Sequence, residues 1–413
     1  MKFLLAEFAF FQSQNRNIRT LLMAMSLFFL TIPVQNAFSC AYILRQTHSV
    51  KTMIFFLMAL YSAVPVASWI NGLWMSRWGA ERLFAFGVGL TGISMFALSL
   101  VNPSSLLAVS LVGASTGVSI GFVWVSHNYL VFISTTDESR NYFQSVELAS
   151  LTFCIMIASF SVGWFVSRVG TPETSYLIVK VIALLLTMTS AALILRNRSP
   201  LPPHPAFVFV HYTPLAWKLF RFAFLHGLTQ LFALCLPVLL VFCVIKENEF
   251  LLGKIQSLGA LVAGLLLYMV GRLARPRHRI WLFMTSAIMY AIGACVNAVF
   301  QTLGSALFLI MALLFFAPLM DIAYTTLFLR AADKVALQEG RNRFTYIFVQ
   351  EVFFYFGRLI TLGMFLIAIR FSVEKLITVV TPILTLIHLF SIPMAWSLSK
   401  MEFSDDPQSG EKL

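Results

Sequence analysis

Between two apolar stretches of this chain stands the segment Gly72-Leu73-Trp74-Met75-Ser76-Arg77-Trp78-Gly79-Ala80-Glu81-Arg82. Glycine reaches backbone conformations that other residues avoid, so Gly72 and Gly79 let two helices approach and let the chain turn sharply. The side chains of Arg77 and Arg82 can bond the last carbonyl groups of a helix and hold that end in a polar layer. The segment therefore predicts a short connection between two helices whose ends are fixed by positive charge.

The composition places these helices in a membrane. Of the 413 residues, 59% are hydrophobic and only 11% are charged, whereas soluble domains contain about 25% charged residues. The apolar stretches are about 20 residues long or longer, which is the length that crosses a bilayer as a helix. We therefore expect an all-α membrane protein that crosses the bilayer many times.

Hydropathy indicates twelve transmembrane helices, six before and six after a proline-rich segment. They are expected at residues 20–42, 53–75, 83–101, 105–133, 142–167, 174–195, 216–245, 250–272, 279–300, 303–329, 343–370 and 375–399. Proline resists helix formation, and five prolines between residues 200 and 214 suit a short, stiff connector. The expected domains are an N-terminal six-helix bundle at 1–195, a cytoplasmic linker at 196–215, a C-terminal six-helix bundle at 216–399 and a cytoplasmic tail at 400–413.

A six-residue element occurs twice in the chain. It reads Glu138-Ser139-Arg140-Asn141-Tyr142-Phe143 and returns 201 residues later as Glu339-Gly340-Arg341-Asn342-Arg343-Phe344. Each copy stands just before a long apolar run. A repeat at about half the chain length indicates two related halves, and two related halves in a membrane protein are typical of secondary transporters. We therefore expect two six-helix pseudo-repeats.

The basic residues predict the orientation. The net charge is +12, but the Lys and Arg residues lie at the ends of apolar runs, so nucleic-acid binding is not expected. With a cytoplasmic N-terminus, the loops and tails outside the spans carry 20 basic residues inside and 7 outside. This bias predicts that both termini are cytoplasmic. The outer segments carry no N-glycosylation sequon, which favours a bacterial inner membrane.

The opening segment resembles the loop signature of the major facilitator superfamily, G-x-L-x-D-R-x-G-x-[RK]-[RK]. Gly72, Arg77, Gly79 and Arg82 stand at matching positions, and a basic, less regular form of the loop occurs at Gly271–Arg279. With the twelve helices and the repeated element, the resemblance covers nearly the whole chain. It implies two six-helix bundles, with the first, fourth, seventh and tenth helices lining a cavity.

The sequence departs from the family pattern at three places. Ser76 replaces the acidic residue that pairs with an arginine in the family. The fourth helix has no arginine, although many proton-driven members carry one there. The fifth helix lacks the GPxxGG element of antiporters. These departures weigh against drug–proton antiport of the kind described for that family.

Three ionisable residues deep in the second half are the main candidates for coupling or substrate binding, Asp321, Glu351 and Arg358. Burying such groups in a bilayer costs about 2.5–3.5 kcal/mol on insertion scales, so each needs a partner or a role. Glu351 and Arg358 are seven residues apart and share one helix face. The three could form a proton or substrate-charge site, with Arg358 binding an anionic group or tuning the acids. They could instead form a structural ion-pair network between the tenth and eleventh helices.

Other charged residues are read as gates or anchors. Glu147 lies near the inner surface and shares a face with Arg140, which favours a cytoplasmic gate pair over a ligand site. Arg341, in the second copy of the repeated element, is expected to bond helix ends or facing acids. With these three residues, Gly72, Arg77, Gly79 and Arg82 complete the predicted cytoplasmic gate. Lys180 is expected to extend its amine to the outer surface, and a coupling role is the alternative.

Uncharged polar residues on the expected cavity helices form a second set of candidates. They are Gln35 and Asn36 beside Pro33, His127 and Asn128 beside Trp124, and His226 and Gln230. Each could orient a ligand in an apolar cavity. Each could instead make an interhelical hydrogen bond, worth about 0.6 kcal/mol on average in membranes. His388, in the expected twelfth helix, is read as structural.

No catalytic or cofactor motif stands out. The five cysteines and seven histidines are scattered, so no metal site or disulfide framework is expected. The chain contains no GxSxG, HExxH or Walker sequence, so an enzyme or a direct ATP-driven pump is not expected. Most of the 41 phenylalanines should contact lipid or fill helix contacts.

We therefore predict a monomeric secondary transporter that moves a small organic solute by alternating access, coupled to protons and without a cofactor. Export of an amphipathic compound is the leading interpretation, because the cavity helices carry few charges. Uptake of a metabolite is the alternative, and the broken loop signature leaves open a sensor or accessory protein that does not transport.

Overall fold

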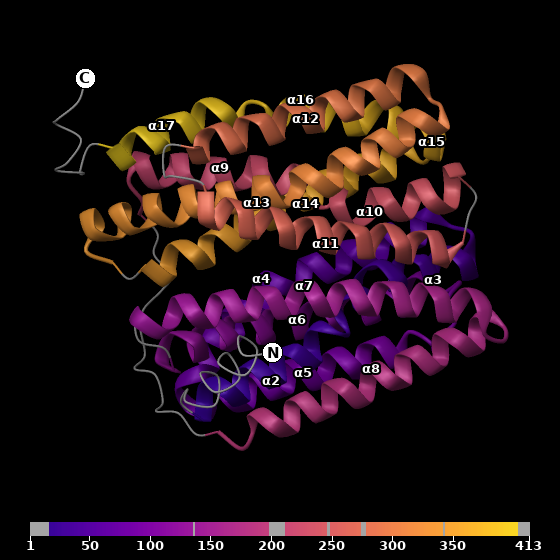
Figure 1. Ribbon diagram of the computed structural model, residues 1–413, viewed down its shortest axis with the longest axis horizontal. Helices are drawn as coiled ribbons and strands as arrows, with labels where there is room; N and C mark the ends of the chain where they lie inside the picture. The colour runs from indigo at the N-terminus through magenta and orange to yellow at the C-terminus, as the bar shows by residue number, and fades with distance from the viewer. Residues whose placement is uncertain are drawn as a thin grey trace, which may run out of the picture. The chain divides into compact units, whose positions relative to one another are not determined.

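The computed structural model describes residues 16–134, 137–197, 211–245, 248–273, 278–341 and 343–403. Within these ranges the side chains of some residues, Arg140 and Arg343 among them, are outside the description. Residues 1–15, most of the linker and most of the C-terminal tail also lie outside it. The regular structure of the described residues is helical (Figure 1).

The chain divides into two compact units. Unit 1 comprises Met1–His204 with Glu249–Ala260, and unit 2 comprises Pro205–Asn248 with Leu261–Leu413. One helix, α11 (Glu249–Leu273), contributes its first turns to unit 1 and the remainder to unit 2. The domain boundaries and the two pseudo-repeats expected from the sequence remain predictions.

Unit 1 otherwise consists of α2 (Arg16–Phe29), η1 (Val34–Phe38), α3 (Ser39–Thr47), α4 (Val50–Trp78), α5 (Ala80–Ala97), α6 (Leu106–Ser134), α7 (Asp137–Arg168) and α8 (Pro172–Ile194). Unit 2 contains α9 (Pro214–Gln230), α10 (Phe232–Leu239), η2 (Leu240–Ile245), α12 (Arg279–Phe300), α13 (Leu303–Glu339), α14 (Arg343–Ala368), α15 (Val373–Lys375), η4 (Leu376–Val380), α16 (Thr381–His388) and α17 (Ser391–Phe403).

Eleven helical spans of the described chain are long and apolar enough to cross a membrane. The remaining expected crossing, the third at residues 83–101, corresponds to α5, which is not among the eleven. Its 18 residues include Glu81 and Arg82 in the first turn, and these two charges lower the mean hydropathy of so short a helix. Several small and polar residues of α5 are buried: Gly87, Gly89, Thr91, Gly92 and Ser94. A helix that is covered by protein does not need a fully apolar surface.

The sharp connection predicted at the opening segment is confirmed. Helix α4 ends at Trp78, α5 begins at Ala80, and Gly79 alone separates them. Gly79 has φ of 80°, a left-handed value that glycine adopts without strain. Its N–H donates to the carbonyl of Met75 at 3.0 Å, which closes the last turn of α4.

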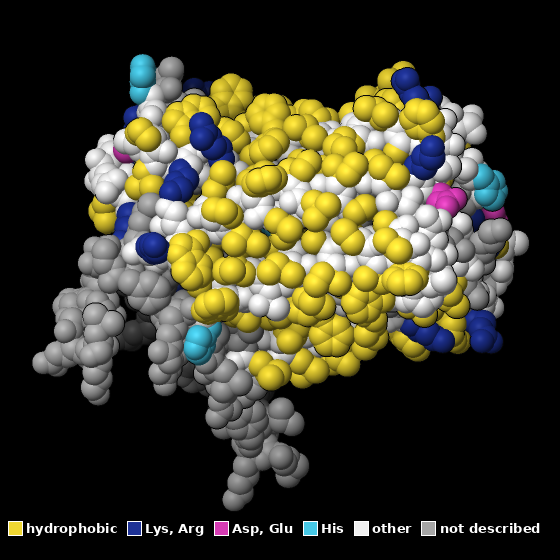
Figure 2. Space-filling view, turned by 90° about the horizontal axis from the view of Figure 1, so that it is seen from above, with side chains coloured by type: hydrophobic (Ala, Val, Ile, Leu, Met, Phe, Trp, Pro, Cys, Tyr) yellow, Lys and Arg dark blue, Asp and Glu magenta, His cyan; other side chains and the backbone are white. Residues whose placement is uncertain are grey.

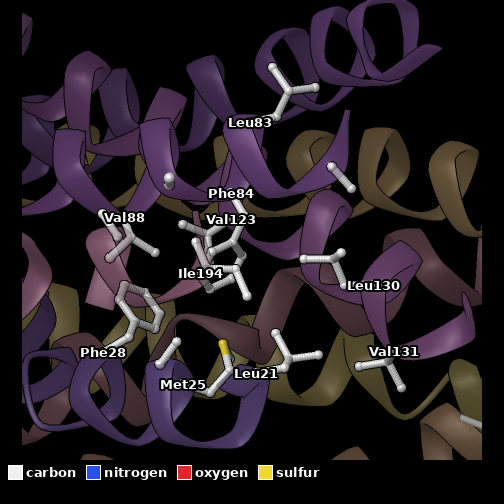
Figure 3. Packing of buried hydrophobic residues seen from close by; sticks show 14 of the residues in the cluster. Leu21, Met25, Phe28, Leu83, Phe84, Val88, Val123, Leu130, Val131 and Ile194 are labelled. Carbon is white, nitrogen blue, oxygen red and sulfur yellow. The ribbon is translucent and has the colours of Figure 1, made fainter. Parts of the chain in front are cut away.

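The core of unit 1 includes buried side chains from α2, α5, α6 and α8 (Figure 3). Phe28 of α2, Phe84 and Val88 of α5, Val123 of α6 and Ile194 of α8 are each at most 2% exposed. Close packing of these side chains supplies dispersion contacts that lipid tails would otherwise make. The cluster fixes α5 inside unit 1.

Helices α4 and α6 pack through a glycine stripe on α6. A Cβ at Gly121 would lie 2.8 Å from the carbonyl oxygen of Val64, and one at Gly117 would overlap the carbonyl oxygen of Leu60. Small residues at every fourth position let transmembrane helices approach to backbone contact. The spacing Gly113, Gly117, Gly121 therefore sets this helix pair.

The surface of the molecule agrees with a membrane setting. Figure 2 shows hydrophobic side chains over the middle of the visible face and Lys and Arg side chains toward its ends. Large apolar side chains such as Leu107, Val299 and Phe371 are more than two-thirds exposed. Apolar exposure on this scale suits contact with lipid.

Candidate functional site

The candidate site is built where α9 crosses α14 in unit 2. Gly227 of α9 and Gly357 of α14 meet there, and a Cβ at Gly357 would lie 2.5 Å from the carbonyl oxygen of Phe224. Neither position has room for a side chain. The crossing brings the sequence neighbours of these two glycines, His226 on α9 and Arg358 on α14, into the same part of unit 2.

His226 joins this crossing to α13. Its ring is 1% exposed, and its Nε2 lies 3.1 Å from Oδ1 of Asp321. The Asp321 side chain is 56% exposed, so the pair has a buried base and an acid that is open to its surroundings. Nδ1 of His226 has no hydrogen-bond partner among the residues that the structure describes.

Arg358 joins the same crossing to the end of α9. Its Nε and Nη2 both donate to Oε1 of Gln230, at 2.8 and 2.5 Å. Its Nη1 also lies 3.8 Å from Oε2 of Glu351, one face of α14 carrying both groups. The guanidinium therefore bridges a neutral amide and a carboxylate, and Arg358 as a residue is 9% exposed.

Aromatic rings connect the two polar pairs. Tyr324 of α13 stacks on His226 with ring centroids 4.0 Å apart and interplanar angle of 6°. The ring of Phe354 is 5.5 Å from that of Tyr324 and 5.3 Å from the Arg358 guanidinium carbon. These rings lie between the two pairs, and an apolar neighbour strengthens a hydrogen bond. Sequence reasoning missed both aromatic residues.

A helix break places Gln230 at the site. Thr213 caps the start of α9 by accepting from the N–H of Ala216, and α9 ends at Gln230. Pro237 lies inside the short α10 that follows, and a π-helical turn comes next. Proline removes a backbone donor and interrupts the regular ladder, while π-turns recur at functional positions. The seventh expected span is therefore discontinuous.

The first expected span is interrupted in the same manner. Pro33 precedes the π-turn η1, and this turn holds Gln35 and Asn36. Gln35 is buried, and Asn36 is half-buried. Both therefore lie at a break within unit 1, and their role as ligands remains a prediction.

Unit 1 contains its own histidine–carboxylate pair, between α6 and α7. Nε2 of His127 lies 2.5 Å from Oε1 of Glu147, and both side chains are largely buried. Asn128, next in sequence, is exposed, and its Oδ1 is 3.4 Å from Nδ1 of His127. Trp124 packs edge-on against the His127 ring at 5.6 Å. Glu147 thus faces a histidine, and its expected contact with Arg140 falls on a side chain outside the described part.

The second copy of the repeated element ties three helix ends together. Glu339 accepts from the backbone N–H of Thr213 at 2.8 Å and from the Tyr346 hydroxyl at 2.5 Å. Nη1 of Arg341 lies 2.9 Å from the same carboxylate, and Gly340 ends α13 with φ of 62°. Arg341 therefore faces an acid at the ends of α13, α14 and α9, and its gating role remains a prediction.

The other gate candidates lie at the α4–α5 connection. Arg77 and Arg82 are exposed, and Gly72 is half-buried. This placement suits residues that meet polar head groups or solvent.

Lys180 departs from expectation. It was predicted to extend to the outer surface, but its side chain lies inside unit 1 at 1% exposure. The prediction was wrong because tyrosine rings enclose the amine, with the centroid of Tyr42 3.3 Å from Nζ.

His388, read as structural, is fully buried and bonds the carbonyl of Leu225 through Nδ1 at 2.9 Å.

The chemistry available at the unit 2 site is proton exchange and charge recognition. Across the described residues no cluster of three or more His, Cys, Asp or Glu side chains could hold a metal ion. The Asp321 carboxylate beside an imidazole can take up or release a proton, and the Arg358 guanidinium can hold an anion.

The comparisons with known proteins bear on the fold of the chain. No known family profile matches the chain. The uncharacterized protein YqgE of Bacillus subtilis (strain 168) is 23% identical over 372 residues, covering 87% of this chain and 84% of that protein. An uncharacterized protein in the sodM 3′ region of Geobacillus stearothermophilus is 23% identical over 201 residues, 48% of this chain and 92% of its own length.

Among solved structures, a mutant of the nucleoside transporter NupG matches with a TM-score of 0.66. The match covers 94% of this chain and all of NupG (100%), at 13% sequence identity. Together with the eleven apolar helices, this likeness defines the class: the chain is a multi-pass helical membrane protein with the fold of a known transporter.

Proposed function

We propose that this protein is a secondary transporter of the major facilitator type, which moves a small organic solute by alternating access with proton coupling. The observation that carries the proposal is the pairing of exposed Asp321 with buried His226 on two different spans of a transporter fold. A carboxylate at membrane depth is costly and is therefore a functional candidate. The loop signature at residues 72–82 supports the family assignment.

Protonation of Asp321 would change the contact between α9 and α13. The proton adds to a carboxylate oxygen and removes the negative charge that attracts the His226 ring. Loss of that attraction frees α13 to move relative to α9, and release of the proton restores the pair. Coupling of this kind requires that solute binding and proton binding favour the same conformation.

Arg358 contributes to this scheme through its contacts with Gln230 and with Glu351. Its double hydrogen bond to Gln230 fixes the guanidinium plane, and a fixed plane recognises a planar anion well. Its contact with Glu351 also stabilises the ionised form of that acid. We propose that Arg358 orients the solute, with Glu351 as a second acid that responds to the proton.

Export of an amphipathic compound remains the first choice, and uptake of a metabolite is the alternative. Nucleosides are the first class to test in either direction, because NupG is a nucleoside transporter. We further propose that the protein is a monomer in a bacterial inner membrane, in contact with lipid and with both termini cytoplasmic.

Transport in proteoliposomes tests the proposal. Purified protein is reconstituted, a pH gradient is imposed in each direction, and a panel that begins with tritiated uridine is screened for accumulation. A one-unit gradient can drive about tenfold accumulation if one proton moves per solute, since one pH unit corresponds to about 1.4 kcal/mol.

Asp321→Asn and Glu351→Gln should abolish accumulation while each protein still folds. Glu374→Gln is the matched control, because Glu374 is exposed in the short helix α15 and lies outside the site. Accumulation by both site variants at the wild-type level would refute the coupling claim. Saturable solute binding without transport by the wild type would favour the sensor alternative.

A further inference from the structure

The inference concerns Lys180, the buried lysine of unit 1. It is the ninth residue of α8, about 12 Å along the axis from the first residue of that helix. The amine at this depth would meet hydrocarbon if it left the protein. At 1% exposure, the residue is covered by protein.

Two tyrosine rings surround the amine. Nζ lies 3.3 Å from the ring centroid of Tyr42 and 5.9 Å from that of Tyr176, and the two rings meet edge-to-face at 5.1 Å. Nζ has no hydrogen-bond partner among the residues that are described. The cation is therefore held by ring faces alone within that part of the chain.

The nearest acids have other partners. Glu173, on α8, accepts from Gln46 at 3.2 Å. Glu249 is 1% exposed and accepts from Nη1 of Arg45 at 2.7 and 2.6 Å and from the hydroxyl of Tyr176 at 3.3 Å. Arg45 thus satisfies the buried carboxylate, and among the described residues Lys180 has no carboxylate as a counterion.

Helices α5 and α2, which pack along α8, bring no further charge to this point. Gly92 of α5 faces Leu184 of α8, whereas Gly89 of α5 faces Met188, so α5 runs antiparallel to α8. Ser190 likewise donates to the carbonyl of Ala24 of α2. The charged residues of these two helices stand at the ends away from Lys180: Glu81 and Arg82 on α5, Arg16 and Arg19 on α2.

Helix α7 and the turn η1 complete the surroundings of α8. Among the described side chains of α7, Glu147 contacts His127 and Arg168 is exposed in the last turn. The turn η1, Val34–Phe38, contains no ionisable side chain. Tyrosine rings are therefore the environment that this amine meets.

The contacts with the tyrosine rings do not offset the free-energy cost of burying a permanent cation at Lys180. A desolvated cation–π contact contributes about 2 kcal/mol, whereas burying an ion costs several kcal/mol even after relaxation. The neutral amine fits the same apolar slot without that cost. We propose that Lys180 is a second coupling residue, carried by unit 1, that binds a proton in one stage of the transport cycle and releases it to water in another.

The proposal rests on the proposed transport function and adds a site in the other unit. In the release step an N–H bond of the ammonium breaks, its electron pair stays on Nζ, and the proton passes to water. The neutral amine no longer needs the Tyr42 ring, so α3 and α8 can separate. Rebinding of a proton restores the contact.

Substitution of Lys180 by arginine distinguishes a proton-binding role from a structural role. Lys180→Arg keeps a cation against the rings but cannot release the proton, because a guanidinium stays charged in proteins. Lys180→Gln removes the charge. Lys375→Arg serves as the matched control, because Lys375 is an exposed lysine of α15 outside both sites.

The test uses tritiated uridine in proteoliposomes, with accumulation under a pH gradient and counterflow without one. Both Lys180 variants should lose the roughly tenfold accumulation and keep counterflow within about twofold of the wild type, and Lys375→Arg should behave as the wild type. Accumulation by Lys180→Arg would overturn the proposal and leave the proposed function standing.

A second measurement needs no solute. Cys40 of α3 is buried two residues before Tyr42, and the other four cysteines can be replaced by serine. The rate of Cys40 labelling by N-ethylmaleimide is measured from pH 6 to 9 in the protein with Lys180 and in the Lys180→Arg variant. Dividing the first rate by the second at each pH cancels the pH dependence of the thiol itself. This ratio of labelling rates should change with pH by about threefold or more. A constant ratio would overturn the Lys180 proposal even if the wild type fails to transport uridine.

Discussion

Arg358 shows how a single side chain in this fold depends on two neighbours. Gln230 receives two of its N–H groups, and Glu351 lies 3.8 Å from a third nitrogen. A lysine offers one point charge and cannot make the paired contact with an amide oxygen. This position therefore requires the guanidinium group of an arginine, and a positive charge alone would not replace it.

Arg358→Lys should weaken solute binding more than it weakens the fold. Loss of one charge-assisted hydrogen bond costs about 1.5–3 kcal/mol, which predicts a rise in KM of about tenfold or more. Arg358→Gln should lose transport entirely because Glu351 is left without a cation. Uptake kinetics measure KM, and an unchanged KM in the lysine variant would contradict a role in binding.

At the same scale, the sequence could identify the charges but not their partners. Asp321, Glu351 and Arg358 stand out because charge is rare in the apolar spans. The pairing of Asp321 with His226 depends on how α9 and α13 pack, and no sequence spacing encodes it. Lys180 was misread because the rings that enclose it come partly from α3, 138 residues earlier in sequence.

At the scale of the helix, the α9–α14 crossing is the element on which the site depends. Gly227 and Gly357 allow backbone contact there, and Thr361 adds a hydrogen bond to the carbonyl of Leu228 at 2.7 Å. A side chain at either glycine would separate the helices. His226 and Arg358 would then move apart with them.

Gly357→Ala should lower the free energy of unfolding by about 1–3 kcal/mol, the usual cost of overpacking. Gly363→Ala is the matched control on the same helix, because a Cβ at Gly363 meets nothing within 4 Å. That control should be neutral or up to about 1 kcal/mol more stable, since alanine favours helix over glycine. Denaturation curves in detergent measure both, and equal stability of the two variants would contradict the packing argument.

Helix breaks were partly predictable and partly not. Prolines at positions 33 and 237 mark the interrupted spans, and proline is readable in sequence. The third expected crossing is a different case. Hydropathy predicted it at residues 83–101, but α5 begins at Ala80 and includes Glu81 and Arg82, which lower the mean hydropathy of its 18 residues.

At the scale of the whole molecule, the number of crossings decides the topology. If α5 crosses the bilayer, the spans number twelve and both termini lie on the same side. If α5 does not cross, eleven spans place the termini on opposite sides. Its 18 residues extend about 27 Å, close to the hydrocarbon thickness.

Reporter fusions distinguish these topologies. A green fluorescent protein fused after residue 413 should fluoresce, and alkaline phosphatase at the same place should be inactive, because the C-terminus is expected in the cytoplasm. An N-terminal tag should likewise be shielded in intact cells. An active phosphatase fusion together with a shielded N-terminal tag would mean an odd number of crossings.

Proton movement with solute is the most direct test of the account. Proteoliposomes loaded with the pH indicator pyranine receive uridine on one side, or whichever compound of the screened panel the wild type transports, and internal pH is followed over time. The account predicts a pH change that begins with solute addition in the wild type and in Glu374→Gln, and none in Asp321→Asn. Solute transport without any pH change, or an unchanged signal in Asp321→Asn, would contradict it.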